Sequence, residues 1–161
     1  MATEQASRSA RIRASLNHPV VDADGHIQEV GPILLDYVRE VGGSDIAERF
    51  LTDPDLNDGR PRQLEERRRT WARKRPFWSA PTDAVDRATV ALPKLLYERM
   101  DELGMDFTVL YPSMGLFTSH IQGDKDLRRL ACRAYNIYAM DMVGGYADRM
   151  TPVGVIPMHT P

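Results

Sequence analysis

The stretch that decides the fold is residues 92–111, LPKLLYERMDELGMDFTVLY. Its first twelve residues carry leucine and methionine three or four positions apart, which predicts a helix with one apolar face. Gly104 follows directly, and a glycine there is typical of a helix C-terminus. Residues 107–111 then form an apolar run, which predicts a strand covered on both faces. A helix that leads by a short turn into a buried strand is typical of α/β proteins.

The same alternation continues on both sides of this stretch. Apolar runs predict two further strands, at residues 20–24 and 150–158. An apolar stripe at helical spacing predicts a helix over residues 127–142, with Asp124 or Asp126 as its N-cap. Strands that alternate with helices imply a parallel sheet with the helices packed outside it.

The rest of the chain is expected to add less to this core. Residues 1–17 are predicted to be a polar N-terminal tail, and residues 18–161 a single α/β unit. A helix is predicted over residues 32–41 and stopped by Gly42-Gly43. The charged, turn-rich segment 42–81 is then expected to be a helical excursion from the main fold.

Three strands make a small sheet with two long edges. A parallel sheet of that size leaves helix faces unburied, and a (β/α)8 barrel typically needs about 250 residues. The fold class expected from the sequence is therefore α/β, a partial TIM barrel that comprises about its first three strands.

Composition narrows the classes of function. The 161 residues are 42% hydrophobic and 27% charged, with a net charge of −2, which argues against nucleic acid or an anionic membrane as a partner. The single cysteine, Cys132, fits a reducing compartment, and no apolar stretch approaches the ~20 residues of a membrane span. A cytoplasmic protein that acts on a small molecule is expected.

The sequence Asp22-Ala23-Asp24-Gly25-His26 lies at the end of the apolar run Val20-Val21 and so at the carboxyl end of the first predicted strand. Residues two apart on a strand share a face, so Asp24 and His26 are expected to present an oxygen and a nitrogen ligand side by side. Glu29 could reach the same place. The alternative is that the aspartates only cap a turn.

Four segments of the chain carry a family resemblance. They are HPVVDADGH (18–26), LYERMDELGMD (96–106), VLYPS (109–113), and CRAYN (132–136) with ADRMTPV (147–153). In this order they resemble the N-terminal part of the amidohydrolase-related TIM-barrel metalloenzymes, which include aminocarboxymuconate-semialdehyde decarboxylase and resorcylate-type decarboxylases.

The resemblance implies a chemistry for this site. In that family an H-x-H, E-x-H or D-x-H pair at the end of the first strand binds a divalent metal, and the pair aligns with Asp24 and His26. An aspartate at the first position leaves Zn possible and makes Mn or another harder ion more plausible, so Zn or Mn is expected. Family members hydrolyse amides or esters, or decarboxylate small carboxylic and aromatic acids without oxidation. The family's remaining metal ligands lie on later strands, beyond residue 161.

Three other residues are candidates because active sites of parallel barrels lie at the carboxyl ends of the strands. Tyr111 ends the second predicted strand, His120 lies in the loop after it, and His159 follows the third. Contact with the substrate, or with the residues that hold the metal, is the role considered for them and for Glu29, and Glu29 could also be a metal ligand itself.

Two alternatives to a metalloenzyme stay open at this point. Asp24 and His26 could serve as acid and base without a metal. The chain could also be an inactive barrel fragment that folds by association with other chains through its sheet edges, which would make it a homo-oligomer or part of a complex.

Overall fold

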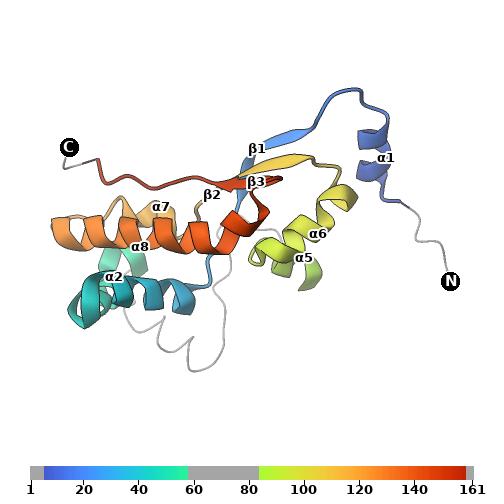
Figure 1. The fold of residues 1–161 in the computed structure, drawn as a ribbon. Coiled ribbons are helices and arrows are strands. Elements are labelled where there is room, and N and C mark those ends of the chain that lie inside the picture. Colours follow the sequence, from blue (N-terminus) through green and yellow to red (C-terminus); the bar gives the residue numbers. More distant parts are fainter. Residues whose placement is uncertain (1–5, 58–83, 159–161) are drawn as a thin grey trace.

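The structure is a computed structural model that describes residues 6–57 and 84–158 (Figure 1). Its elements, in chain order, are α1 (Arg8–Ala14), β1 (Val21–His26), α2 (Gly31–Thr52), α3 (Pro54–Asn57), α5 (Ala84–Thr89), α6 (Pro93–Leu103), β2 (Phe107–Tyr111), α7 (Gly115–Thr118), α8 (Lys125–Val143), the 3-10 helix η1 (Gly144–Tyr146) and β3 (Met150–Pro152). No helix within these ranges is both long enough and apolar enough to span a bilayer.

The three strands form one parallel sheet in the order β1-β2-β3. Figure 1 shows α2, α6 and α8 on one side of this sheet. The predicted α/β fold, with parallel strands alternating with helices, is thus confirmed. The sheet is open, with β1 and β3 at its edges, so the described residues do not form a closed barrel.

Several ends of helices and strands lie where local sequence patterns predicted them. Strand β2 covers the predicted residues 107–111. Helix α6 ends at Gly104, which adopts a left-handed conformation with φ of 76° that suits glycine. Helix α8 begins after Asp124, whose side chain accepts a hydrogen bond of 2.9 Å from the amide of Leu127. These signals act within a few residues, so the sequence reveals them directly.

Helix α8 supplies the centre of the core. Its buried residues are Leu127, Ala131, Cys132, Ala134, Tyr135, Tyr138, Ala139 and Val143. Most of them pack in one cluster with Leu34, Leu35 and Val38 of α2. A second cluster joins Met100 of α6 to Leu110 of β2 and Met150 of β3. The first cluster therefore holds the two longest helices together, and the second fixes α6 against the sheet.

The excursion predicted for residues 42–81 is wrong for its first part. Helix α2 is interrupted at Gly43, with φ of 81°, but it resumes and continues to Thr52. Ile46, Ala47 and Phe50 are buried in the core cluster of α2 and α8. The kink at Gly43 changes the direction of the helix without ending its burial. The charged helix expected at residues 63–74 lies outside the described residues.

Two further details differ from expectation. Strand β2 buries only one face: Thr108 and Leu110 are buried, whereas Phe107 and Val109 are half-buried and Tyr111 is exposed. Strand β3 has three residues, shorter than the predicted 150–158. The amide of Val153 still donates to the carbonyl of Leu110 at 2.9 Å, and residues 154–158 belong to no strand. The apolar run in the sequence did not show whether one face of the strand or both faces would be buried.

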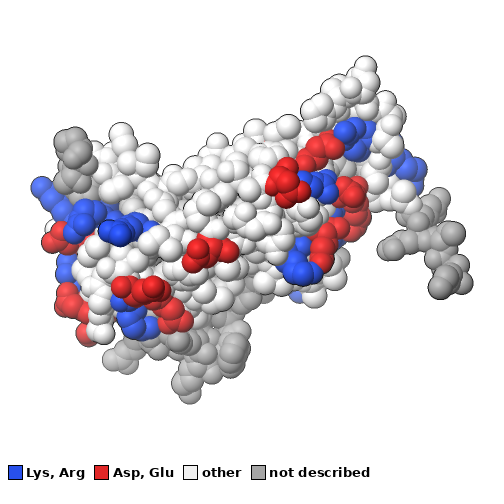
Figure 2. Space-filling model, viewed as in Figure 1, with Lys and Arg blue, Asp and Glu red and all other residues white. Residues whose placement is uncertain are grey.

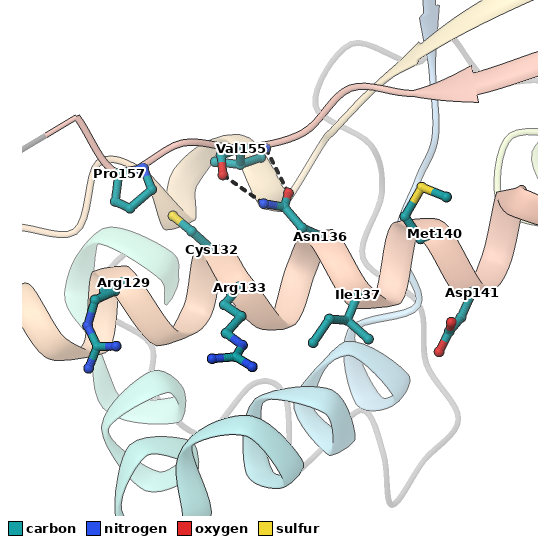
Figure 3. A pocket seen from close by; sticks show the side chains of 9 residues that line it. All are labelled: Arg129, Cys132, Arg133, Asn136, Ile137, Met140, Asp141, Val155 and Pro157. Atoms are coloured by element: carbon teal, nitrogen blue, oxygen red, sulfur yellow. Dashed lines mark hydrogen bonds between the residues drawn. The ribbon is translucent and has the colours of Figure 1, made fainter. Parts of the chain in front are cut away.

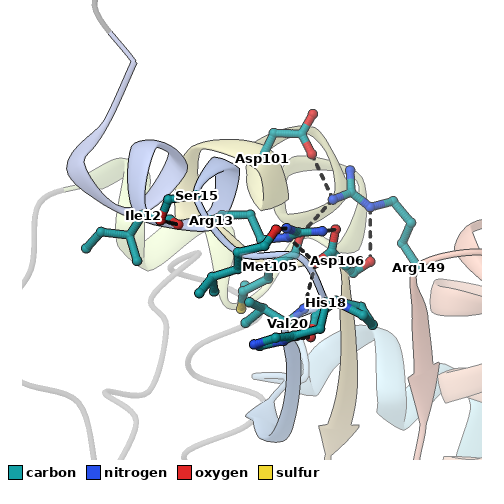
Figure 4. Close-up of polar contacts among 11 residues, drawn as sticks. Ile12, Arg13, Ser15, His18, Val20, Asp101, Met105, Asp106 and Arg149 are labelled. Carbon is teal, nitrogen blue, oxygen red and sulfur yellow. Dashed lines mark hydrogen bonds and ion pairs between the residues drawn. The ribbon is translucent and has the colours of Figure 1, made fainter.

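The amino end of the sheet is closed by a polar network (Figure 4). Helix α1, in a segment expected to be a tail, places Arg13 against Asp106, and both guanidinium nitrogens Nε and Nη2 donate to its carboxylate. Asp106 also accepts the amide of Val20 at 2.7 Å. Arg149 donates to the carbonyl of Met105 at 2.7 Å and pairs with Asp101 at 2.8 Å. The network ties α1 and α6 to the starts of all three strands.

Candidate functional site

The candidate site begins with an irregularity in strand β1. Asp22 is paired with Thr108 and Gly25 with Leu110, so two residues of β1 stand opposite the single residue Val109 of β2. This is a β-bulge, which turns the following side chains to a new direction. A Cβ atom on Gly25 would lie 2.3 Å from Oγ1 of Thr108 and 2.9 Å from the carbonyl oxygen of Val109. Only glycine fits there, because those atoms leave no room for a methyl group.

Asp22 stabilises the bulge from within. Its Oδ1 accepts the amide of Asp24 at 3.0 Å, and its Oδ2 accepts the hydroxyl of Thr108 at 3.3 Å. A carboxylate that binds the amide two residues later is the Asx geometry common in turns. The turn alternative is therefore observed for Asp22, and it sets the position of Asp24.

Asp24 and His26 are brought together at the carboxyl end of β1. Nε2 of His26 lies 4.0 Å from Oδ1 of Asp24, and the side chains are 34% and 96% exposed. Metal bonds from histidine nitrogen and carboxylate oxygen are about 2.0–2.2 Å long, so an ion bound to both atoms at this separation would lie almost on the line between them. The exposed carboxylate of Asp24 would have to move closer to His26 to give a tetrahedral angle. The pair fits two ligands of a divalent metal. Among the described residues no group of three or more metal-binding side chains is present.

Tyr111 lies next to His26. The two residues are register partners across β1 and β2, and their ring centroids are 6.0 Å apart at an angle of 43°. Tyr111 is 39% exposed. An aromatic ring that lies beside the imidazole and still faces solvent can contact a molecule bound at Asp24 and His26.

Glu29 occupies a different position from the one expected. It is buried, its Oε1 accepts the amides of Ser113 at 2.9 Å and Gly115 at 3.1 Å, and its Oε2 accepts the amide of Met114 at 2.7 Å. Burial raises the pKa of Glu29, against the opposing effect of these hydrogen bonds. The carboxylate holds the loop after β2 to the chain after β1.

Ser113 closes the same contact from the loop side, because its hydroxyl donates to the carbonyl of Ile27 at 2.5 Å. We call Glu29, Ser113, Met114 and Gly115 the loop clasp. The clasp fixes the carboxyl ends of β1 and β2 relative to each other, and so fixes His26 relative to Tyr111. Glu29 lies more than eighty residues before the other three members, and no local pattern indicated this contact.

The structure does not join His120 to this pair. His120 is exposed, and its Nδ1 lies 2.8 Å from the carbonyl of Leu116 in its own loop. Since a carbonyl only accepts, that nitrogen carries a proton and Nε2 is the remaining acceptor of the neutral ring. His159 lies outside the described residues.

The arrangement can bind and polarise a small molecule. An exposed carboxylate, an imidazole and a phenol ring meet at the carboxyl edge of a parallel sheet, where ligands of open α/β proteins bind. Thr108 is a residue that the sequence analysis missed as part of this site, whereas Asp22 was considered there only as a turn cap. The aspartate two positions before Asp24 was the available signal. Comparison of the chain with family models, curated proteins and solved structures gave no match.

Proposed function

We propose that Asp24 and His26 are two ligands of a divalent metal, Zn or Mn, in a hydrolase or non-oxidative decarboxylase for small carboxylic or aromatic acids, amides or esters. The observation that carries the proposal is the 4.0 Å approach of Nε2 and Oδ1 at the carboxyl end of β1. The D-x-H spacing and the four-segment resemblance give the pair its expected chemistry. A complete centre needs further ligands from outside the described residues.

The fold supports the proposal through its layering. Helices α2, α6 and α8 lie on one side of the sheet (Figure 1), and the residues of β2 on the opposite face are half-buried or exposed. In a (β/α)8 barrel the helices are outside and the other face of the sheet lines the interior. We propose that the three strands are the first three of such a barrel.

Each residue of the site has a distinct task under this proposal. A bound divalent metal would polarise a carbonyl or activate a water molecule. Asp24 and His26 hold the ion, and the carboxylate of Asp22 keeps the backbone of Asp24 in place. Tyr111 presents its ring edge and hydroxyl to the substrate beside His26. The loop clasp keeps these groups at fixed separations.

Metal binding tests the proposal directly. The chain is dialysed to equilibrium against Zn²⁺ or Mn²⁺, and bound metal is counted by mass spectrometry. We expect Asp24→Asn and His26→Ala each to weaken binding at least about tenfold, since even indirect contacts to a ligand are worth that much. Asp126→Asn and His18→Ala change the same residue types at exposed positions away from the pair, and they should bind metal like the original chain.

The same measurement separates the two enzymatic alternatives. Nε2 and Oδ1 at 4.0 Å could also form an acid–base pair, in which the carboxylate orients the imidazole. Unchanged metal content in both variants would contradict the ligand assignment. A turnover on small acids, amides or esters that chelators leave intact and His26→Ala abolishes would favour the metal-free pair.

A further inference from the structure

The outer surface of α8 carries a row of four side chains, one every four residues. Arg129, Arg133, Ile137 and Asp141 point to the same side of the helix (Figure 3). The row is basic at its first two positions, apolar at the third and acidic at the fourth. Ile137 is 38% exposed and the neighbouring Met140 is 56% exposed, so the apolar centre faces solvent.

A groove of about 520 Å³ runs along this row, between α8 and the chain after β3. Asn136 holds the two walls together, because its side chain donates to the carbonyl of Val155 at 3.0 Å and accepts its amide at 2.8 Å. Beside the groove, Ile156 and Met158 are 68% and 87% exposed. An apolar surface of this kind, with charges at its rim, is typical of protein interfaces.

We propose that a second copy of this chain binds here, with its α8 antiparallel to the first α8 and a two-fold axis at Ile137. Arg133 precedes Ile137 by four residues and Asp141 follows it by four, so each lies about 6 Å from the axis along the helix. Antiparallel packing places Arg133 of one copy opposite Asp141 of the other. The symmetry forms this ion pair twice.

The remaining charges fit the same arrangement. Arg129 lies about 12 Å from the axis, opposite the carboxyl end of the second α8, where backbone carbonyls carry partial negative charge. Figure 2 shows basic side chains over the amino-terminal half of α8 and acidic atoms nearer its other half. Parallel packing would instead bring arginine to arginine, which is unfavourable.

The charged groups of the row are available for such pairing. Within the described residues Arg133 makes no ion pair, and Arg129 contacts Asp126 at 3.5 Å on the surface. Oδ2 of Asp141 accepts the hydroxyl of Tyr37 at 3.0 Å. That bond uses one carboxylate oxygen, so the other can accept from an arginine of the second copy.

Sedimentation velocity tests the proposal at protein concentrations from about 1 to about 100 µM, which covers weak and moderate dimers. We expect a reversible species of twice the 18.2 kDa monomer mass. Ile137→Glu should raise its dissociation constant at least tenfold. Arg133→Glu and Asp141→Arg should each do the same, because each places like charges opposite each other.

The double variant Arg133→Glu/Asp141→Arg is the decisive one, because it reverses both charges and restores the pairing. We expect its dissociation constant within about threefold of the original chain, an allowance for the scatter between related contacts. Arg8→Glu makes the same charge change on α1, away from this face, and should leave the dimer intact. Circular dichroism verifies that each variant is folded.

Three outcomes would overturn the inference. The first is a monomer throughout the concentration range. The second is a dimer that Ile137→Glu and the single reversals leave unchanged, which would place the interface elsewhere on the surface. The third is a double variant as weak as the single ones, which would exclude the Arg133–Asp141 pairing across the axis.

Discussion

The two ends of the sheet use charged residues in opposite ways. At the amino end, Asp106 is bound by Arg13 and the amide of Val20, and Arg149 is bound to Asp101 and two backbone carbonyls. At the carboxyl end, the side chain of Asp24 is 96% exposed. Charges in the first region hold elements together, whereas the carboxylate in the second faces solvent.

The carboxyl end is itself built in two layers. Asp24 is exposed and His26 is half-buried at the end of β1, and the chain then enters the loop clasp, in which Glu29 is buried and both its oxygens accept backbone amides. A ligand site needs groups that still have bonds to form, and it needs a rigid base that keeps them in position. Asp24 and Glu29 lie five residues apart and illustrate these two roles: Asp24 is free to contact a ligand, and Glu29 belongs to the rigid base.

Glu29→Ala is expected to give the largest loss of stability, because it leaves the amides of Ser113, Met114 and Gly115 without their acceptor. Each buried polar group left unpaired costs about 1–3 kcal/mol, so the loss of this acceptor for three amides should lower the free energy of unfolding by about 3 kcal/mol or more. Urea unfolding at pH 7 measures it. Glu48→Ala, at an exposed position of α2, is the matched control, and a loss no larger than the control's would show that the clasp is not structural.

Gly25→Ala should have the next largest effect. The added methyl group would overlap Thr108 and the carbonyl of Val109, and overpacking of this kind typically costs about 1–3 kcal/mol. The strain falls on the bulge, so metal binding by Asp24 and His26 should weaken with stability. Gly145→Ala, whose new Cβ would meet no atom within 4 Å, provides the control in the same unfolding experiment. Equal stability of the two variants would refute the steric role of the bulge.

These residues also show how far the sequence could be interpreted. The bounds of β2, the left-handed end of α6 at Gly104 and the cap of α8 at Asp124 all follow from local patterns, and the structure confirms them. The continued burial of α2 beyond Gly43 was missed, because glycine pairs end many helices and only tertiary packing shows that this one resumes.

The candidate site was predictable to a similar extent. The D-x-H spacing placed Asp24 and His26 together, as found, although the strand alternation used for that prediction is interrupted by the bulge. The partners of Glu29 are amides more than eighty residues away, and periodicity carries no information about contacts at that separation. A carboxylate near a predicted metal site is therefore easily mistaken for a ligand when its true partners are distant.

The pH dependence of stability should distinguish Asp106 from Glu29. Hydrogen bonds from Arg13 and Val20 lower the pKa of Asp106 below its ordinary value of 3.8. Its contribution is therefore present above pH 3.8 and disappears as pH falls through the lower folded value. Burial raises the pKa of Glu29 above 4.5, so its ionisation lowers stability as pH rises from 4.5.

Asp106→Asn should therefore lower the free energy of unfolding more at pH 7 than at pH 3. The original chain should lose stability as pH rises above 4.5 because Glu29 ionises, and Glu29→Gln should not show this loss. Unfolding midpoints in urea at a series of pH values give both slopes. Asp36→Asn on α2, at an exposed carboxylate outside both regions, is the reference for the general effect of a lost charge. The two substitutions should change the dependence of stability on pH in opposite directions. Changes in the same direction would contradict the opposite pKa shifts of Asp106 and Glu29.

Asp24→Ala should have the smallest effect on stability. Its side chain is 96% exposed, and among the described residues its one charged neighbour is the imidazole of His26 at 4.0 Å. Exposed substitutions of this kind change the free energy of unfolding by less than about 0.5 kcal/mol. Paired urea titrations of the original chain and the variant check this value. A loss above about 1 kcal/mol would show that Asp24 stabilises the fold as Asp106 does. Unchanged stability together with lost metal binding would instead show that the two ends of the sheet have different roles. The charged groups at the amino end would maintain the fold, and those at the carboxyl end would bind a ligand.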